Sequence, residues 1–159
     1  MSKINELFAR ADTVYIFDVD GVLVRMEFGE YNHYTLNDED WAEALKEHDF
    51  YEGLKPVLTI QQFLRNKDMS RVYVATKVMN EIEKEQKIRF LNKEYHILPD
   101  HVFEVYRNED KLNVIRKVQN FYPELDERSF VFIDDTVDIL TYVMNNSSYC
   151  TVHVSSFLK

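Results

Sequence analysis

Residue types that shape many small proteins are scarce in this chain of 159 residues, which has one cysteine, three glycines and three prolines. Because Cys150 is the only cysteine, an intramolecular disulfide is excluded and a zinc finger lacks its thiolate ligands. The low Gly and Pro content excludes collagen-like and linker-rich chains. No apolar run exceeds four residues, so the sequence predicts neither a membrane span nor the apolar core of a signal peptide. We therefore expect a cytoplasmic protein with no membrane partner.

Positive charge is also in short supply, since 28 Asp and Glu residues outnumber 19 Lys and Arg residues and give a formal net charge of −9. This balance disfavours nucleic acid polymers as partners, because basic surfaces bind them. A small anionic substrate remains compatible if local cations offset the overall field. The length predicts a single domain over residues 1–159, and a hydrophobic content of 45% is enough for a buried core.

Short runs of β-branched and aromatic residues alternate with helical patterns along the chain. The runs are apolar on both faces, like interior parallel strands, and cover residues 13–18, 71–76, 101–106, 129–133 and 149–154. Between them, Pro56 predicts the first turn of a helix, and Asn80 and Glu83 resemble a capping box. Thr136 is placed to cap a later helix. The alternation predicts an α/β fold that binds ligands beyond the carboxyl ends of its strands.

Residues 25–53 interrupt this alternation with a long polar and aromatic segment. The segment follows the first strand and contains one predicted helix, over residues 38–46. Loops of this length in compact domains are usually functional or wrongly assigned. We interpret the segment as an inserted flap or small cap.

Polar side chains follow the first two apolar runs. Asp18 ends the first run and Asp20 comes two residues later, so an extended backbone would point both carboxylates into one site. Gly21 then allows a sharp exit and a close backbone approach. Thr76 ends the second run, where its hydroxyl can bind a phosphate oxygen while Lys77 adds charge. The alternatives are a polar turn after the first strand, a helix cap for Thr76 and a merely exposed Lys77.

Charged groups follow the third and fourth runs as well. Lys111 lies early in a helical pattern and offers a compact cation for phosphate or for crowded carboxylates. Asp134 and Asp135 follow the fourth run, and Asp138 lies four residues after Asp134. Adjacent carboxylates at the end of a buried strand repel each other and suit Mg²⁺, which prefers carboxylate, water and phosphate oxygens. The alternatives are a surface lysine and an acid-rich helix N-terminus, although the second explains Asp134 less well.

The segments FDVDGVL, VYVAT, NEDKLNVI and FIDDTVD together resemble, in order, the four motifs of the haloacid dehalogenase superfamily. The motifs and the strand pattern between them span residues 13–144, nearly the whole chain. The resemblance implies a Rossmann-like three-layer sandwich with a five-stranded parallel sheet of order 3-2-1-4-5. It also implies Mg²⁺-dependent phosphoryl transfer. Asp20 is typical of the phosphatase branch, because a leaving alkoxide needs a proton whereas a halide does not.

The match to these motifs implies a role for each candidate residue. Asp18 would be the nucleophile, and Asp20 would be the general acid and base. Thr76 would hold a phosphate oxygen, Lys111 would orient the nucleophile and the phosphate, and Lys77 would be a further phosphate contact. The implied metal ligands are the carboxylates of Asp18, Asp134 and Asp135 and the backbone carbonyl of Asp20.

The predicted substrate is a small phosphorylated metabolite, hydrolysed through an aspartyl-phosphate. The stretch HDFYEGLKPVLTIQQFL is faintly similar to the 5'(3')-deoxyribonucleotidases, which suggests a nucleotide. Aromatic residues of the insert could then stack on a base, and they are Phe28, Tyr31, Tyr34, Trp41, Phe50 and Tyr51. However, the insert is short for that family's cap, and these aromatics could simply pack the flap against the domain.

Other functions remain as alternatives. A phosphatase of sugar phosphates or other metabolite phosphates would use the same motifs, and so would a catalytically retired phosphate-binding protein on the same fold. A signalling receiver domain fits poorly, because its acidic pair follows the first strand and its phosphoacceptor the third. Here the candidate nucleophile Asp18 ends the first strand, and the acidic pair ends the fourth.

Overall fold

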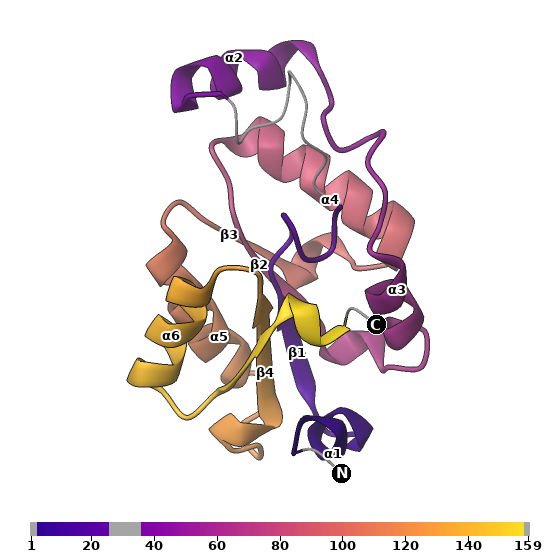
Figure 1. Cartoon of the computed structure of the whole chain (residues 1–159), viewed down its shortest axis with the longest axis vertical. Coiled ribbons are helices and arrows are strands. Elements are labelled where there is room, and N and C mark those ends of the chain that lie inside the picture. Colours follow the sequence, from indigo (N-terminus) through magenta and orange to yellow (C-terminus); the bar gives the residue numbers. More distant parts are fainter. Residues whose placement is uncertain (1–2, 26–35, 158–159) are drawn as a thin grey trace.

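Five short strands rich in β-branched and aromatic residues form the sheet at the centre of the molecule (Figure 1). The computed structural model describes residues 3–25 and 36–157. Its strands are β1 Val14–Phe17, β2 Val72–Lys77, β3 Val102–Val105, β4 Phe130–Asp134 and β5 Cys150–His153. All five predicted strands are confirmed, each within one residue of its expected bounds.

The strands are parallel and lie in the order β3-β2-β1-β4-β5, as the motif resemblance implies. Strand β1 pairs with β2 on one side and with β4 on the other, so Tyr15 lies opposite both Val72 and Val131. The chain passes from β1 to β2 and β3, and then crosses to the other side of β1 to form β4. This reversal of the strand order between β1 and β4 opens a crevice beyond the carboxyl ends of these two strands. Sheets of α/β proteins bind ligands in such a crevice.

Helices cover both faces of the sheet, with α3 and α4 on one face and α5 and α6 on the other (Figure 1). The α-helices are α1 Lys3–Ala9, α2 Asp38–Glu47, α3 Leu58–Leu64, α4 Glu81–Tyr95, α5 Lys111–Gln119 and α6 Val137–Asn146. Short 3₁₀ helices are η1 Met69–Arg71, η2 Pro99–His101, η3 Asn108–Asp110, η4 Glu127–Ser129 and η5 Val154–Phe157. Within residues 3–25 and 36–157, no helix combines the length and apolar character that crossing a membrane requires.

Side chains of β1 alternate between two core layers. Tyr15 and Phe17 pack with apolar residues of α3 and α4, whereas Val14 and Ile16 pack with those of α5 and α6. All four residues are at most 2% exposed. Because a slip of one residue would exchange the two faces, this packing fixes the register of the strand. The fixed register determines where the chain leaves the sheet at Asp18, the first residue after β1.

Residues 18–71 lie between β1 and β2 and contain α2 and α3. The helix predicted over residues 38–46 is confirmed as α2, which lies beside α4 (Figure 1). Its Trp41 and Leu45 are buried. Part of the predicted flap, with Phe28, Tyr31 and Tyr34, lies outside the described residues.

The chain around Pro56 is extended, so the prediction of a helix start at this residue is wrong. Pro56 forms an isolated bridge with Val24, and the N–H of Arg25 donates to the carbonyl of Lys55 at 3.0 Å. This pairing with the chain after β1 delays the start of α3 to Leu58. Tertiary pairing here overrides the local preference of proline for the first turn of a helix.

The prediction that Asn80 caps α4 is confirmed, because its Oδ1 accepts the N–H of Glu83 at 3.0 Å. Replacing Asn80 with alanine removes this acceptor, so we expect the free energy of unfolding to fall by about 0.5–2 kcal/mol. Urea denaturation followed by circular dichroism measures the change. Lys93→Ala, at an exposed position of the same helix, is the control and should change stability by about 0.5 kcal/mol or less. Equal effects of the two substitutions would mean that the cap contributes nothing.

Candidate functional site

The carboxyl ends of β1, β2 and β4 bring the predicted site residues to one edge of the sheet. Asp18 follows β1 directly, Thr76 is the penultimate residue of β2, and Asp134 ends β4. Lys111 is the first residue of α5 and reaches the same edge. At most 7% of each of these residues is exposed. The edge therefore gathers charged and polar groups where water solvates them poorly.

Three carboxylates at this edge form a group that can hold a metal ion. One oxygen from each of Asp18, Asp134 and Asp135 lies within 4.8 Å of the other two. Carboxylate oxygens are the ligands of hard divalent cations such as Mg²⁺, Ca²⁺ and Mn²⁺. The donor set therefore fits such a cation, which would also offset the repulsion among three neighbouring negative charges.

Hydrogen bonds orient the two aspartates at the end of β4. Asp134 Oδ1 accepts the backbone N–H of Thr136 at 2.8 Å, and the Thr136 hydroxyl donates to Asp135 Oδ1 at 3.2 Å. The Nε2 atom of His153 lies 3.0 Å from the carbonyl oxygen of Asp135. Thr136 occupies the N-cap position of α6, but its side chain makes no capping bond. The expected helix cap is thus replaced by support for the acidic pair, which is typical of groups around a metal ligand.

Gly21 allows the chain after β1 to pass directly beside Asp135. The residue has a φ of +74°, and a Cβ atom on it would lie 2.3 Å from Asp135 Oδ2. A side chain at this position would therefore both strain the backbone and displace a member of the acidic group. The close backbone approach expected at Gly21 is confirmed, and its partner is the carboxylate of Asp135, which directly follows β4.

Lys111 is the counterion of this acidic group. Its Nζ lies 3.1 Å from Asp18 Oδ1 and 2.8 Å from Asp134 Oδ2. Burial raises the pKa of Asp18 to about 7 even though Lys111 favours its charged form, and Asp134 and Asp20 raise it further. Burial and the neighbouring Asp134 also raise the pKa of Asp135. One lysine thus leaves the group short of positive charge, and a bound cation would supply it.

The Asp20 carboxylate lies beside a second lysine and is not among the three carboxylates of the metal-binding group. Lys87 Nζ donates to Asp20 Oδ2 at 2.7 Å, and the Tyr51 hydroxyl donates to Oδ1 at 2.8 Å. Tyr51 also contacts Glu83 Oε1 at 3.2 Å. Burial opposes the charge on Lys87, but the carboxylates of Asp20 and Glu83 outweigh it and raise the pKa of the lysine. Lys87 and Tyr51 therefore hold the Asp20 carboxylate by both of its oxygens, apart from the three clustered carboxylates.

Thr76 and Lys77 end β2 next to this second lysine. The Lys87 ammonium donates to Thr76 Oγ1 at 3.1 Å and to the carbonyl of Lys77 at 2.6 Å. The side chain of Lys77 is exposed, whereas that of Thr76 is buried. The structure thus brings Thr76 and Asp20 to one ammonium group, while Lys77 extends toward solvent.

Lys87 is a site residue that the sequence patterns do not reveal, whereas Glu83 and Tyr51 have other roles than the sequence predicts. Glu83 was predicted to complete a capping box, but its Oε2 accepts the N–H of Met79 at 2.7 Å, not that of the N-cap residue. The signal that could have revealed Lys87 is its position on the buried face of α4, four residues before Leu91 and four after Glu83. Charged residues on a buried helical face are rare unless they are paired.

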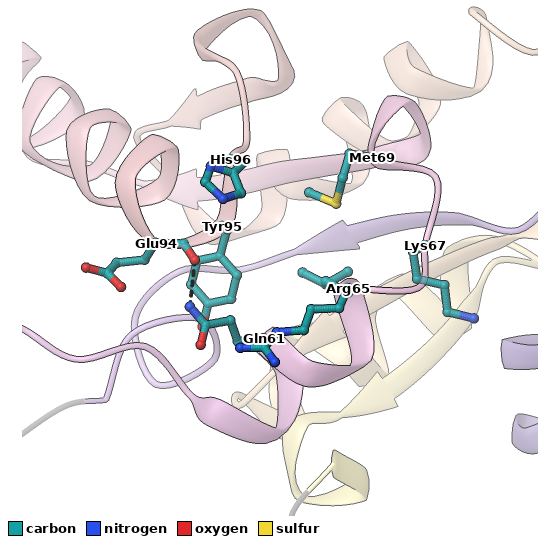
Figure 2. Close-up of a pocket in the computed structure, with 8 residues that line it drawn as sticks. Gln61, Arg65, Lys67, Met69, Glu94, Tyr95 and His96 are labelled. Carbon is teal, nitrogen blue, oxygen red and sulfur yellow. Dashed lines mark hydrogen bonds between the residues drawn. The ribbon is translucent and has the colours of Figure 1, made fainter.

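A pocket of 120 Å³ adjoins Asp20 between α2 and the chain after β2. It is lined by Asp20, Leu36, Asp38, Trp41, Lys77, Val78, Met79 and Glu83. A larger cavity of 320 Å³ lies elsewhere, between α3 and the end of α4, where Gln61 donates to the carbonyl of Glu94 at 2.7 Å (Figure 2). None of the predicted site residues lines that second cavity. Because Asp20 is part of its lining, the small pocket is placed to receive part of a ligand bound at the sheet edge.

The aromatic residues of the insert that the structure describes are engaged in packing. Trp41 is 7% exposed, and its ring centroid lies 4.6 Å from that of Phe50. Its indole N–H donates to Glu83 Oε2 at 3.4 Å. Tyr51 is 2% exposed and lies against Phe90 of α4. These contacts attach the insert to α4, which agrees with the packing interpretation for Trp41, Phe50 and Tyr51.

Comparison with known proteins adds no assignment for this site. No family model matches the chain, and a search of the curated proteins found no match.

The contact at Gly21 yields a test of the metal-binding group. Gly21→Ala should weaken binding of Mn²⁺ about tenfold or more, because the added methyl displaces Asp135. Electron paramagnetic resonance of free Mn²⁺ during a titration measures the dissociation constant. Gly53→Ala is the matched control, since a Cβ atom there would have no neighbour within 4 Å. Unchanged affinity in folded Gly21→Ala would remove Asp135 from the group.

Proposed function

We propose that the protein is a Mg²⁺-dependent phosphatase that hydrolyses a small phosphomonoester through an aspartyl-phosphate intermediate. The observation that carries the proposal is the buried group of Asp18, Asp134 and Asp135, with Lys111 as its counterion, at the switch point of a parallel sheet. The order of the sheet and the four motifs support an activity of the haloacid dehalogenase kind. The protein would act on a free metabolite and not on a nucleic acid polymer.

The first step would be attack by Asp18 on phosphorus. A carboxylate oxygen of Asp18 forms a bond to phosphorus, while the bond from phosphorus to the ester oxygen breaks. Asp20, which would be protonated when the substrate binds, gives its proton to the departing oxygen, so that the alcohol leaves as a neutral molecule. The position of Asp20 two residues after Asp18, on a turn that begins at the end of β1, supports this division of roles.

The second step would regenerate the enzyme. Asp20, now a carboxylate, removes a proton from water, and the water oxygen attacks phosphorus. The bond between phosphorus and Asp18 then breaks, inorganic phosphate is released, and the two aspartates return to their starting states. A bound Mg²⁺, held by Asp18, Asp134, Asp135 and the backbone carbonyl of Asp20, would supply neutralisation of the negative charge.

Two residues would hold the phosphate oxygens, and a third would attract them from a distance. Thr76 contributes its hydroxyl from the end of β2, and Lys111 contributes its ammonium beside Asp18. Lys77 is an exposed cation next to the pocket and adds a longer-range attraction. Fixed donors of this kind stabilise the charge that spreads over the equatorial oxygens during phosphoryl transfer.

The pocket beside Asp20 favours a small polar alcohol as the organic part of the substrate. Its volume of 120 Å³ is below the about 300–1,000 Å³ of typical ligand pockets, and its lining includes the exposed carboxylate of Asp38. Carboxylates of this kind accept hydrogen bonds from hydroxyl or amino groups. This observation favours a sugar phosphate or similar metabolite phosphate over a nucleotide as the substrate.

Asp18→Asn should abolish phosphate release, because an amide is a far poorer nucleophile than a carboxylate. We expect turnover of 4-nitrophenyl phosphate with Mg²⁺ to fall by about 10³-fold or more. Excess chelator should lower the turnover of the wild-type protein in the same way, because it removes the metal ion. Asp138→Asn is the control, since Asp138 is exposed in the first turn of α6, outside the acidic group. Wild-type turnover in Asp18→Asn, or full activity with chelator present, would contradict the proposal.

Asp20→Asn should slow hydrolysis according to the leaving group. An alkoxide needs a proton as it departs, whereas a nitrophenolate leaves readily without one, so the substitution should affect alkyl phosphates more. General acid catalysis predicts a loss of about 10²–10⁴-fold for an alkyl phosphate. The measurement is kcat for glycerol phosphate and for 4-nitrophenyl phosphate, each with saturating Mg²⁺. Equal losses for the two substrates would remove the acid role from Asp20.

A further inference from the structure

Lys87 is a fully buried lysine on α4 whose ammonium group reaches three parts of the site. It is 0% exposed, and its Nζ lies 2.7 Å from Asp20 Oδ2 and 3.0 Å from Glu83 Oε1. The same nitrogen donates to Thr76 Oγ1 and to the carbonyl of Lys77. An ammonium group has three hydrogens, and four acceptors surround this one. The lysine therefore has no donor left over for a ligand.

Other positions on the buried side of α4 hold apolar or aromatic side chains. Leu91, one turn later on the same face of α4, is 0% exposed and belongs to the core cluster. Burying a charge costs free energy that an apolar residue avoids, and a buried ion pair often stabilises no better than a well-packed hydrophobic residue. The contacts of Lys87 point instead to a role in holding its partners. Among these partners, Asp20 is the residue that donates and accepts protons in the proposed reaction.

Two donors hold the Asp20 carboxylate on opposite oxygens. Lys87 binds Oδ2 and the Tyr51 hydroxyl binds Oδ1, so rotation of the carboxylate would break both contacts. Lys87 is itself fixed by the end of β2 through Thr76 and Lys77. The rigid sheet thus sets the position of Asp20 through Lys87. A displacement of about 1 Å at a catalytic group can cost about 10²-fold in rate.

We propose that Lys87 is a positioning residue that holds the Asp20 carboxylate in line with the ester oxygen of the bound phosphomonoester. This inference rests on the proposed phosphatase function and adds to it a residue outside the four motifs. Lys87 acts through Asp20 and does not contact the substrate. Its loss should therefore reproduce the leaving-group pattern of an Asp20 substitution without weakening the metal-binding group.

The test compares two substrates in Lys87→Met. The expected result is a fall in kcat of about 10²-fold for glycerol phosphate and at least about tenfold less for 4-nitrophenyl phosphate. Mn²⁺ affinity should stay within about twofold of the wild type. In an Asp20→Asn background, the same substitution should lower kcat for glycerol phosphate by less than about twofold, because two residues that act as a unit are not additive.

Lys84→Met is the matched control. Lys84 lies one turn earlier on α4, is only partly buried and pairs with Glu104 and Glu81 away from Asp20. The Lys84→Met substitution should leave the ratio of kcat for glycerol phosphate to kcat for 4-nitrophenyl phosphate unchanged. Because Lys87→Met leaves buried carboxylates unpaired, Lys87→Met combined with Glu83→Gln is the second variant, with Glu83→Gln alone as its reference.

Each outcome decides between defined alternatives. Equal losses on both substrates would make Lys87 a structural residue and overturn the positioning role, while the phosphatase function stands. Failure of both Lys87 variants to fold would overturn it in the same way. Absence of any Mg²⁺-dependent turnover in the wild type would instead overturn the proposed function, and the positioning role with it.

Discussion

The balance of charge at the carboxyl edge of the sheet is the constraint on which the rest of the site depends. Four carboxylates gather there with two buried lysines, and these residues are Asp18, Asp20, Asp134, Asp135, Lys87 and Lys111. Burial raises the pKa of Asp18 to about 7, which shows how poorly the lysines alone compensate the acids. Removing these groups from water is costly unless each charge has a partner. A divalent cation among the three clustered carboxylates would restore the balance.

The two lysines divide this edge into two halves. Lys111 joins Asp18 to Asp134 on the side of β4, where a cation would bind, and Lys87 joins Asp20 to the end of β2. Tyr51 connects the second half to the insert, because its hydroxyl contacts both Asp20 and Glu83. The half around Lys111 contains the three carboxylates that can hold a cation. In the half around Lys87, hydrogen bonds fix the orientation of the Asp20 carboxylate. The small pocket opens beside the second half, where the organic part of a substrate would extend.

The sequence predicted the strands and the gathering of their polar ends well, because both depend on local patterns. The run SFVFI is typical of a buried strand, so the two aspartates that follow it are expected at the end of that strand, and parallel strands share one carboxyl edge. Lys87 escaped prediction because its role depends on which residues α4 faces after packing. Glu83 and Pro56 were misjudged for the same reason, since tertiary contacts replaced the capping bond of one and the helical turn of the other. These contacts are non-local, so they could not be predicted from the sequence.

The proposed function requires that Asp18, Asp134 and Asp135 together bind one divalent cation. Anomalous diffraction from crystals grown with Mn²⁺ tests this most directly, because the metal gives a signal that water and protein do not. We expect a single strong anomalous peak within about 2.0–2.4 Å of an oxygen from each of the three carboxylates. An empty site at saturating Mn²⁺, or a peak bound by other residues, would contradict it.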